Sequence, residues 1–165
     1  MSKKRLKEIE PKNKKQREFL NAIADFPLVF ATGSAGTGKT FLAAAKALED
    51  LSYGFVKRIV LVRPAVATED IGYLPGTFEE KLDPYLLPLI DSLSTISNPK
   101  HVQELMQTNQ IEIAALAFMK GRTFNDTFII LDEAQNSTIE QMKMFLTRFG
   151  ENVRVVITGD PVQSD

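Results

Sequence analysis

The sequence predicts an α/β protein in which a parallel β-sheet is flanked by helices on both faces. Short apolar runs alternate along the chain with longer segments that have the apolar spacing of helices, as is typical of strands joined by crossover helices. A glycine-rich loop joins the first apolar run to the helix-like segment after it. With 165 residues, 44% of them hydrophobic, the chain is long enough for one domain with a buried core.

Strands are expected where the apolar runs are short and bounded by glycine, proline or polar residues. The interiors of the first two runs contain no polar residue, which favours strands that are buried on both faces. The segment between residue 113 and Gly121 fits neither a strand nor a helix clearly. The five expected strands are residues 28–32, 58–63, 110–113, 127–131 and 154–158.

Helices are expected between these strands, and several of them begin with capping signals. The capping pairs are Thr77 with Glu80, Asn98 with Pro99, and Ser137 with Glu140. Pro84 and Pro88 are expected to bend or interrupt the helix that begins at Thr77, because proline removes a backbone donor. The expected helices are residues 13–25, 39–52, one that begins at 77, 99–107, and one that begins at 137 and ends before Gly150.

The composition excludes several classes of site. The chain has no cysteine and one histidine, His101, so disulfides, thiol nucleophiles and multi-histidine metal sites are ruled out. No apolar run approaches the roughly 18 residues that span a membrane, and no apolar segment follows the basic start, so a secretory signal is not expected. These observations predict a cytoplasmic protein without a membrane partner.

The net charge of −1 is unevenly distributed along the chain. Residues 1–17 carry eight basic and two acidic side chains, whereas acidic side chains predominate in the remainder. We expect a basic arm at residues 1–12, followed by a single domain at residues 13–165. Such an arm either holds nucleic acid through its phosphates or is a solvated tail, and its charge alone favours the tail.

The strongest functional signal is the run GSAGTGKT at residues 33–40. It matches the phosphate-binding pattern G-x-x-x-x-G-K followed by Ser or Thr, and it stands between an expected strand and an expected helix, as that motif requires. Glycines let successive backbone N–H groups converge on phosphate oxygens, and the following helix N-terminus favours the same anion. This loop predicts a P-loop NTPase fold. Its predicted nucleotide-binding residues are Gly33, Ser34, Ala35, Gly36, Thr37, Gly38, Lys39 and Thr40.

Two of these residues have specific predicted roles. Lys39 is expected to reach the β- and γ-phosphates of a nucleotide, and the Thr40 hydroxyl is expected to ligate Mg²⁺. Asp132 and Glu133 follow a buried apolar run, which places both carboxylates at the end of a strand. Asp132 is predicted to hold the same Mg²⁺, and Glu133 to orient and deprotonate the water that attacks the γ-phosphate. Alternatively, the two acids are ordinary polar residues at a strand end.

A third polar group follows the last expected strand. Because ligands bind at the carboxyl ends of strands in open parallel sheets, we expect this group to converge with the other two. Gln163 is predicted to sense the γ-phosphate or the attacking water, and Asp160 to assist the metal or contact a phosphate. Gly-Asp-Pro is also a favourable turn sequence, so a turn without a ligand role is the alternative.

Four further residues are weaker candidates. Gln16 lies before the first strand, and its amide offers the donor and acceptor that adenine recognition needs, although an exposed helix glutamine is the favoured interpretation. Arg63, Lys120 and Arg122 lie near expected strand ends or loops. Each either contacts a phosphate of nucleotide or nucleic acid, or is a solvated surface charge. His101 is interpreted as a surface residue.

The sequence resembles the PhoH-like family, which consists of P-loop ATPases whose core is related to that of superfamily 1 helicases. The resemblance covers nearly the whole chain after the basic arm and rests on several motifs besides the phosphate loop. These motifs are RPAV at 63–66, IGYLPG at 71–76, FMKGRTF at 118–124, IILDEAQN at 129–136 and GDPVQSD at 159–165.

The resemblance implies a RecA-like core, ATP binding with Mg²⁺, ATPase activity, a role in RNA or other nucleic-acid metabolism, and ring-type self-association. It also implies that Gln16 is the adenine-reading glutamine of the related helicases. The sequence ends directly after the third motif, whereas the family's core continues through a further strand and helix. We therefore expect either a C-terminally incomplete domain or an unusually short protein.

Together these observations predict a Mg²⁺-dependent ATP-binding protein that hydrolyses ATP, with Lys39, Glu133 and Gln163 as catalytic residues. The alternative is a non-catalytic nucleotide switch or nucleic-acid-binding module, which the basic arm and the early end of the sequence suggest. A small-molecule phosphotransferase is disfavoured, because Glu133 and Gln163 suit attack by water. Any arginine that acts on the γ-phosphate is expected in trans, from a neighbouring subunit or a partner.

Overall fold

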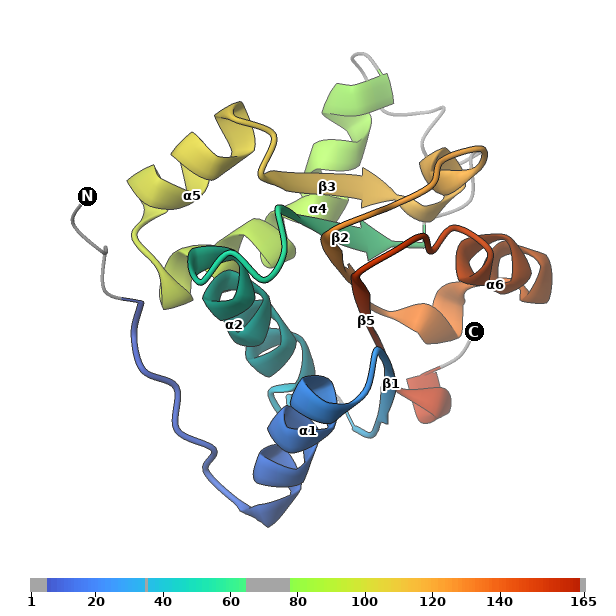
Figure 1. Ribbon diagram of the computed structural model, residues 1–165. Helices are drawn as coiled ribbons and strands as arrows, with labels where there is room; N and C mark the ends of the chain where they lie inside the picture. Colours follow the sequence, from blue (N-terminus) through green and yellow to red (C-terminus); the bar gives the residue numbers. More distant parts are fainter. Residues whose placement is uncertain (1–5, 35, 65–77, 164–165) are drawn as a thin grey trace.

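A five-stranded sheet organises the chain in the computed structural model, which describes residues 6–34, 36–64 and 78–163. All neighbouring strands pair in parallel, in the spatial order β1-β5-β4-β2-β3 (Figure 1). The strands are β1 (Leu28–Thr32), β2 (Arg58–Arg63), β3 (Ile111–Ala115), β4 (Thr127–Leu131) and β5 (Val153–Gly159). The predicted parallel sheet is therefore confirmed.

Helices cover both faces of this sheet, although unequally. The helices are α1 (Lys14–Asp25), α2 (Lys39–Ser52), α4 (Phe78–Ile96), α5 (Pro99–Gln107) and α6 (Ile139–Leu146), with short 3-10 helices η1 (Leu116–Met119), η2 (Ala134–Asn136) and η3 (Pro161–Gln163). One buried cluster joins α1, α2, α4 and α5 to one face of the sheet, and a second joins α6 and η1 to the other face (Figure 1). The α/β class with helices on both faces is thus confirmed.

The strand order places β5 between β1 and β4. Every residue of β4 is buried, because this strand lies inside the sheet and is covered on both faces. The phosphate-loop sequence follows β1, and Asp132 follows β4. Thr158 and Gly159 are the last residues of β5, the strand that lies between β1 and β4. Three segments far apart in the sequence therefore reach the same edge of the sheet.

The N-cap of helix α6 is one residue later than predicted. The hydroxyl of Ser137 donates to the carbonyl of Ala134, 2.5 Å away, and is therefore engaged with η2. Thr138 is the N-cap instead, and it forms a reciprocal capping box with Gln141. The predicted box of Ser137 with Glu140 is wrong, because two adjacent hydroxyl residues offered equivalent local caps and the contact with η2 selected between them.

Other elements show smaller differences from expectation. Helix α4 is continuous through Pro84 and Pro88, so the helix is not interrupted at either proline. Burial of Leu89 and Leu93 in the core stabilises the second half of this helix. Strand β3 extends two residues further than predicted, to Ala115. The capping pair at Thr77 and the 71–76 motif lie outside the described residues. No helix among the described residues is long and apolar enough to cross a membrane.

Candidate functional site

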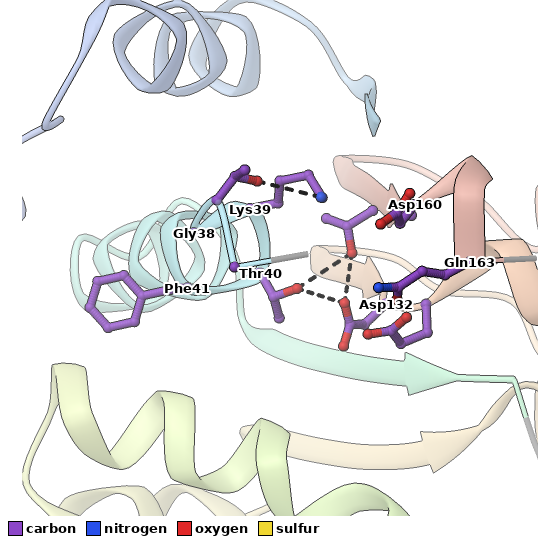
Figure 2. A pocket seen from close by; sticks show the side chains of 12 residues that line it. Gly38, Lys39, Thr40, Phe41, Asp132, Asp160 and Gln163 are labelled. Carbon is purple, nitrogen blue, oxygen red and sulfur yellow. Dashed lines mark hydrogen bonds between the residues drawn. The ribbon is translucent and has the colours of Figure 1, made fainter. Parts of the chain in front are cut away.

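A cavity of about 220 Å³ opens at the carboxyl edge of the sheet (Figure 2). It lies where the N-terminus of α2 faces the ends of β4 and β5, so the three predicted polar groups meet in one place. In Figure 2, Thr40 and Asp132 point toward one another, whereas Phe41 points away from them. The lining residues are Gly36, Thr37, Gly38, Lys39, Thr40, Phe41, Asp132, Glu133, Thr158, Gly159, Asp160 and Gln163.

The loop between β1 and α2 has a backbone that requires glycine. Gly36 and Gly38 have φ angles of 78° and 85°, in the left-handed region that L residues with side chains rarely adopt. Gly38 is also the N-cap of α2, and no side chain caps this helix end or places an acid in its first turn. The first N–H groups of α2 are therefore left for an anion. Ala35 lies outside the described residues.

Lys39 folds back over this loop. Its Nζ donates to the carbonyl oxygens of Gly33 and Ser34, at 2.5 and 2.8 Å. The hydroxyl of Thr37 donates to the same Ser34 carbonyl at 3.0 Å. The ammonium group is therefore held by carbonyl oxygens of the loop, and its contact with phosphate stays a prediction.

Asp132 is the most extensively bonded carboxylate of the cavity, and it is only 4% exposed. Its Oδ1 accepts hydrogen bonds from the hydroxyls of Thr40, at 2.6 Å, and Thr158, at 2.8 Å. Its Oδ2 accepts from Nε of Arg63 at 3.0 Å, and the Arg63 Nη2 lies 2.9 Å away. Burial of this charge is thus compensated by two hydroxyls and a guanidinium group.

The oxygen donors around Asp132 fit a magnesium ion that is shared with a nucleotide. Mg²⁺ prefers hard oxygen ligands and is usually bound by one or two carboxylates together with substrate phosphates and water. Thr40 and Asp132 supply a hydroxyl and a carboxylate at the same point of the cavity. No group of three or more acidic or histidine side chains that could hold a metal unaided occurs among the described residues.

The backbone changes direction at Glu133, just after the end of β4. The φ of 55° and ψ of 40° at this residue are left-handed, an uncommon conformation for a residue with a side chain. Its Oε2 accepts a hydrogen bond from Nε2 of Gln135 at 2.5 Å. The Gln135 Oε1 in turn accepts from the backbone N–H of Asp160 at 3.1 Å. Gln135 therefore links the ends of β4 and β5.

The Asp160 side chain stabilises the turn after β5. Its Oδ1 accepts from the N–H of Val162 at 3.0 Å, and its carbonyl accepts from the N–H of Gln163 at 3.1 Å. The turn interpretation is thus realised at Asp160, which also lines the cavity. Gln163 lines the cavity as an exposed residue of η3. A role for either residue toward phosphate or metal stays a prediction.

Gln16 lies against the phosphate loop from α1. Its Nε2 donates to the carbonyl of Thr37 at 3.1 Å, and its Oε1 accepts from the N–H of Lys12 at 2.7 Å. The structure therefore brings Gln16 to the loop, although its adenine-reading role stays a prediction. His101, interpreted as a surface residue, has a 25% exposed side chain beside Glu104.

The two candidate arginines occupy different environments. Arg63 lies on Asp132, as described above, and is absent from the cavity lining. Arg122 binds Glu112 in a two-point contact, with N–O distances of 2.6 and 2.8 Å, and stacks 4.7 Å from the ring centroid of Phe124. Hydrogen bonds from Arg122 lower the pKa of the Glu112 carboxyl below its ordinary value. Lys120 is exposed.

Sequence reasoning singled out neither Thr158 nor Gln135 as a site residue. Thr158 is 1% exposed and donates to Asp132. A polar residue at the end of an otherwise apolar strand was an available signal for it. Gln135 had no comparable signal, because its second partner lies 25 residues further along the chain.

Comparison with known proteins identifies relatives over nearly the whole chain. Residues 8–165 match the family model described as PhoH-like protein. The chain is 53% identical over 163 residues to a PhoH-like protein of Mycobacterium leprae, 52% over 160 residues to one of Bacillus subtilis, and 48% over 157 residues to Protein PhoH of Escherichia coli. These alignments cover 98%, 96% and 93% of this chain.

The same alignments cover 47%, 50% and 44% of those relatives, so the chain spans about half the length of the curated relatives it matches. A solved structure, the Sulfolobus solfataricus SWI2/SNF2 ATPase core in complex with dsDNA, is similar in fold, with a TM-score of 0.50 and 19% sequence identity. That alignment covers 93% of this chain and 34% of the other. This similarity concerns the fold alone and agrees with a parallel α/β sheet flanked by helices.

Proposed function

Because the chain belongs to the PhoH-like protein family, we propose that this domain binds ATP together with Mg²⁺ and hydrolyses it. One observation carries the proposal. A glycine-rich loop with Lys39, the bonded pair of Thr40 and Asp132, and the adjacent acid Glu133 all line a single cavity. Phosphoryl transfer to water needs these groups and neither cysteine nor histidine.

Each group has a distinct part in the proposed reaction. The N–H groups of the loop and the Lys39 ammonium hold the phosphates and stabilise the charge that develops on them. Thr40 and Asp132 would hold Mg²⁺, which supplies further charge neutralisation when it is bound. Glu133 accepts a proton from the attacking water, and Gln163 donates or accepts a hydrogen bond at the γ-phosphate.

Two substitutions test this assignment. We expect Lys39→Ala to weaken ATP binding by about 100-fold or more, because it removes the charge nearest the phosphates. Glu133→Gln should keep the wild-type ATP affinity but lose turnover. Calorimetric titration and phosphate release measure the two effects, with Lys100→Ala, an exposed lysine on α5, as the control. Normal hydrolysis by Glu133→Gln would disprove the mechanism.

The cavity also supports an arginine supplied in trans. Lys39 is the one cationic side chain among the described residues that line it, and the guanidinium of Arg63 is bound to Asp132. We therefore propose that a neighbouring subunit supplies an arginine to the γ-phosphate, which requires self-association. Light scattering with and without ATP tests this. A monomer with full activity would exclude it.

A second function, as a nucleic-acid-responsive nucleotide switch, is suggested by Gln16. Its amide joins the N–H of Lys12, the last residue of the basic arm, to the Thr37 carbonyl of the phosphate loop. Single-stranded RNA bound to the arm would thereby influence the loop. ATP affinity and turnover, measured with and without RNA, separate the two functions. Intact ATP binding without turnover in either condition would favour the switch.

A further inference from the structure

The carboxylate of Glu133 is held by a neighbour to which the reaction outlined above assigns no role. Gln135 spans the gap between β4 and β5. Its Nε2 donates to Glu133 Oε2 at 2.5 Å, and its Oε1 accepts from the backbone N–H of Asp160 at 3.1 Å. Each end of one amide is thus engaged by a different strand end, so the orientation of the amide is determined by both partners.

Gly159 provides the space for this bridge. A Cβ at residue 159 would lie 3.1 Å from Oε1 of Gln135 and 3.4 Å from its backbone nitrogen. The backbone of Gly159 is not in the left-handed region, so its conformation would accept another residue. Glycine is therefore needed at residue 159 to leave room for the side chain of Gln135, and not because the backbone conformation there requires it.

Within residues 6–34, 36–64 and 78–163, Gln135 is the hydrogen-bond partner of the Glu133 carboxylate. The left-handed backbone of Glu133 sets the direction in which the side chain leaves the chain, but the carboxylate itself can still rotate. The bond from Gln135 removes that freedom. A general base must lie within hydrogen-bond reach of the water that it deprotonates, so whatever sets this rotation also sets the efficiency of the base.

The bridge also connects Glu133 to the turn that carries Gln163. Gln135 accepts from the N–H of Asp160, and the carbonyl of Asp160 accepts from the N–H of Gln163 at 3.1 Å. Gln163 lies exposed at the cavity, in the position proposed to meet the γ-phosphate. A displacement of this turn would pull on the Gln135 amide and thus on the carboxylate of Glu133.

We propose that Gln135 is a positioning residue, which couples the orientation of the Glu133 carboxylate to the turn at residues 160–163. This inference rests on the proposed function, because it assigns Glu133 the role of general base. Gln135 acts through Glu133 and through the turn, and it is not among the described residues that line the cavity. Its loss should therefore lower kcat and leave ATP affinity unchanged.

The first test replaces the amide by a side chain of similar length that forms neither hydrogen bond. We expect Gln135→Met to lower kcat by about tenfold or more, with the ATP Kd within about twofold of wild type. Gln103→Met makes the same change at an exposed position of α5 and should leave both constants unchanged. A Gln135→Met variant with wild-type kcat, or with equal losses in affinity and kcat, would overturn the proposal.

A second variant disrupts the two hydrogen bonds of the Gln135 amide without altering Gln135 itself. Gly159→Ala places a methyl group against the amide and should lower kcat as Gln135→Met does. In the Gln135→Met background the added methyl should have little further effect, because the bridge is already absent. Effects that multiply independently in the double variant would show that Gly159 and Gln135 are uncoupled, which would overturn the proposal.

A readout without turnover separates this inference from the proposed function. The side-chain NH₂ signals of Gln135 in an NMR spectrum of nucleotide-free protein are identified by their loss in Gln135→Met. They should shift in both Glu133→Ala and Gly159→Ala, and unchanged signals in both variants would contradict the bridge. A wild type without ATP turnover would refute the proposed function, whereas an active wild type with a fully active Gln135→Met would refute the role of Gln135 alone.

Discussion

Two clusters on the same sheet pair an acid with arginine, but they differ in what else binds the acid. Asp132 at the carboxyl end of β4 binds Arg63, and Glu112 on β3 binds Arg122 and also Arg58. Both acids lie within a strand or at its end, and each forms hydrogen bonds with a guanidinium. Sequence reasoning proposed Arg63 and Arg122 equally as phosphate contacts, since both lie near strand ends or loops.

The difference lies in the second oxygen of each carboxylate. Both oxygens of Glu112 are bound by guanidinium groups, so its hydrogen-bonding capacity is used within the protein. Asp132 gives only Oδ2 to Arg63, while Oδ1 meets two hydroxyls at the lining of the cavity. An arginine partner therefore does not identify a functional acid. The contact of Oδ1 with two hydroxyls at the cavity is the observation that supports the proposed metal role of Asp132.

The largest effect is expected from a substitution that disrupts the cluster at the cavity. Asp132→Asn should abolish the contribution of Mg²⁺ to ATP binding and lower turnover by about 100-fold or more, because the site loses its charged metal ligand. ATP titrations with and without Mg²⁺ measure the first effect. Glu112→Gln, the same loss of charge in the other cluster, should retain the full Mg²⁺ effect. If Asp132→Asn also retained it, the two clusters would not differ as described.

An intermediate effect is expected at Glu112 itself. Glu112→Gln should lower the free energy of unfolding by about 1–2 kcal/mol at pH 7, a value reduced for the partial exposure of the three side chains. Urea denaturation measures it. ATP affinity should remain at the wild-type value, because none of these side chains lines the cavity. A loss of affinity without a loss of stability would reverse the assignment.

The difference in the free energy of unfolding between wild type and Glu112→Gln should depend on pH in a defined direction. Because hydrogen bonds from Arg122 lower the pKa of folded Glu112, the ionised carboxylate stabilises the fold fully above the unfolded pKa of about 4.3. This contribution is lost as the pH falls through the lowered folded pKa. The stability gap between wild type and Glu112→Gln should therefore narrow as the pH falls below about 4.3. A gap that widens on acidification would contradict the ion-pair assignment.

The smallest expected effect concerns geometry rather than charge. Arg122→Lys keeps the cation but loses the two-point contact with Glu112 and the stacking on Phe124. We expect a loss of about 0.5–1 kcal/mol in the free energy of unfolding and no change in nucleotide binding. Thermal melts, compared with those of Lys120→Arg at an exposed position, provide the measurement. Weaker ATP binding by Arg122→Lys would restore its predicted phosphate role.

Most strands and two helices were predictable with their bounds. Residues 28–32, 58–63 and 127–131 form expected strands, and residues 39–52 and 99–107 form expected helices. Each is a run whose apolar pattern ends at a glycine, a proline or a polar residue, so local sequence contains the whole signal. The start of α6 was not predictable in this way, because Ser137 and Thr138 are both good caps and a contact with η2 selected Thr138.

The site was predictable in its chemical groups but not in its bonding. The loop, Thr40, Asp132 and Glu133 were expected to converge from the rule that ligands bind at the carboxyl ends of parallel strands, and they line one cavity. Gln135 was not expected, because its amide has a role only when β5 lies beside β4 and Gly159 leaves room for it.

By itself the sequence determined the local conformations and the chemistry on offer, including a phosphate loop that needs glycine, a lysine, hydroxyls and two adjacent carboxylates. These features depend on sterics and hydrogen bonds within a few residues. Only the tertiary structure decided the partners. Asp132 meets Thr158, Arg63 and Thr40 from 26, 69 and 92 residues away. Those contacts follow from the strand order, which brings β5 and β2 to either side of β4.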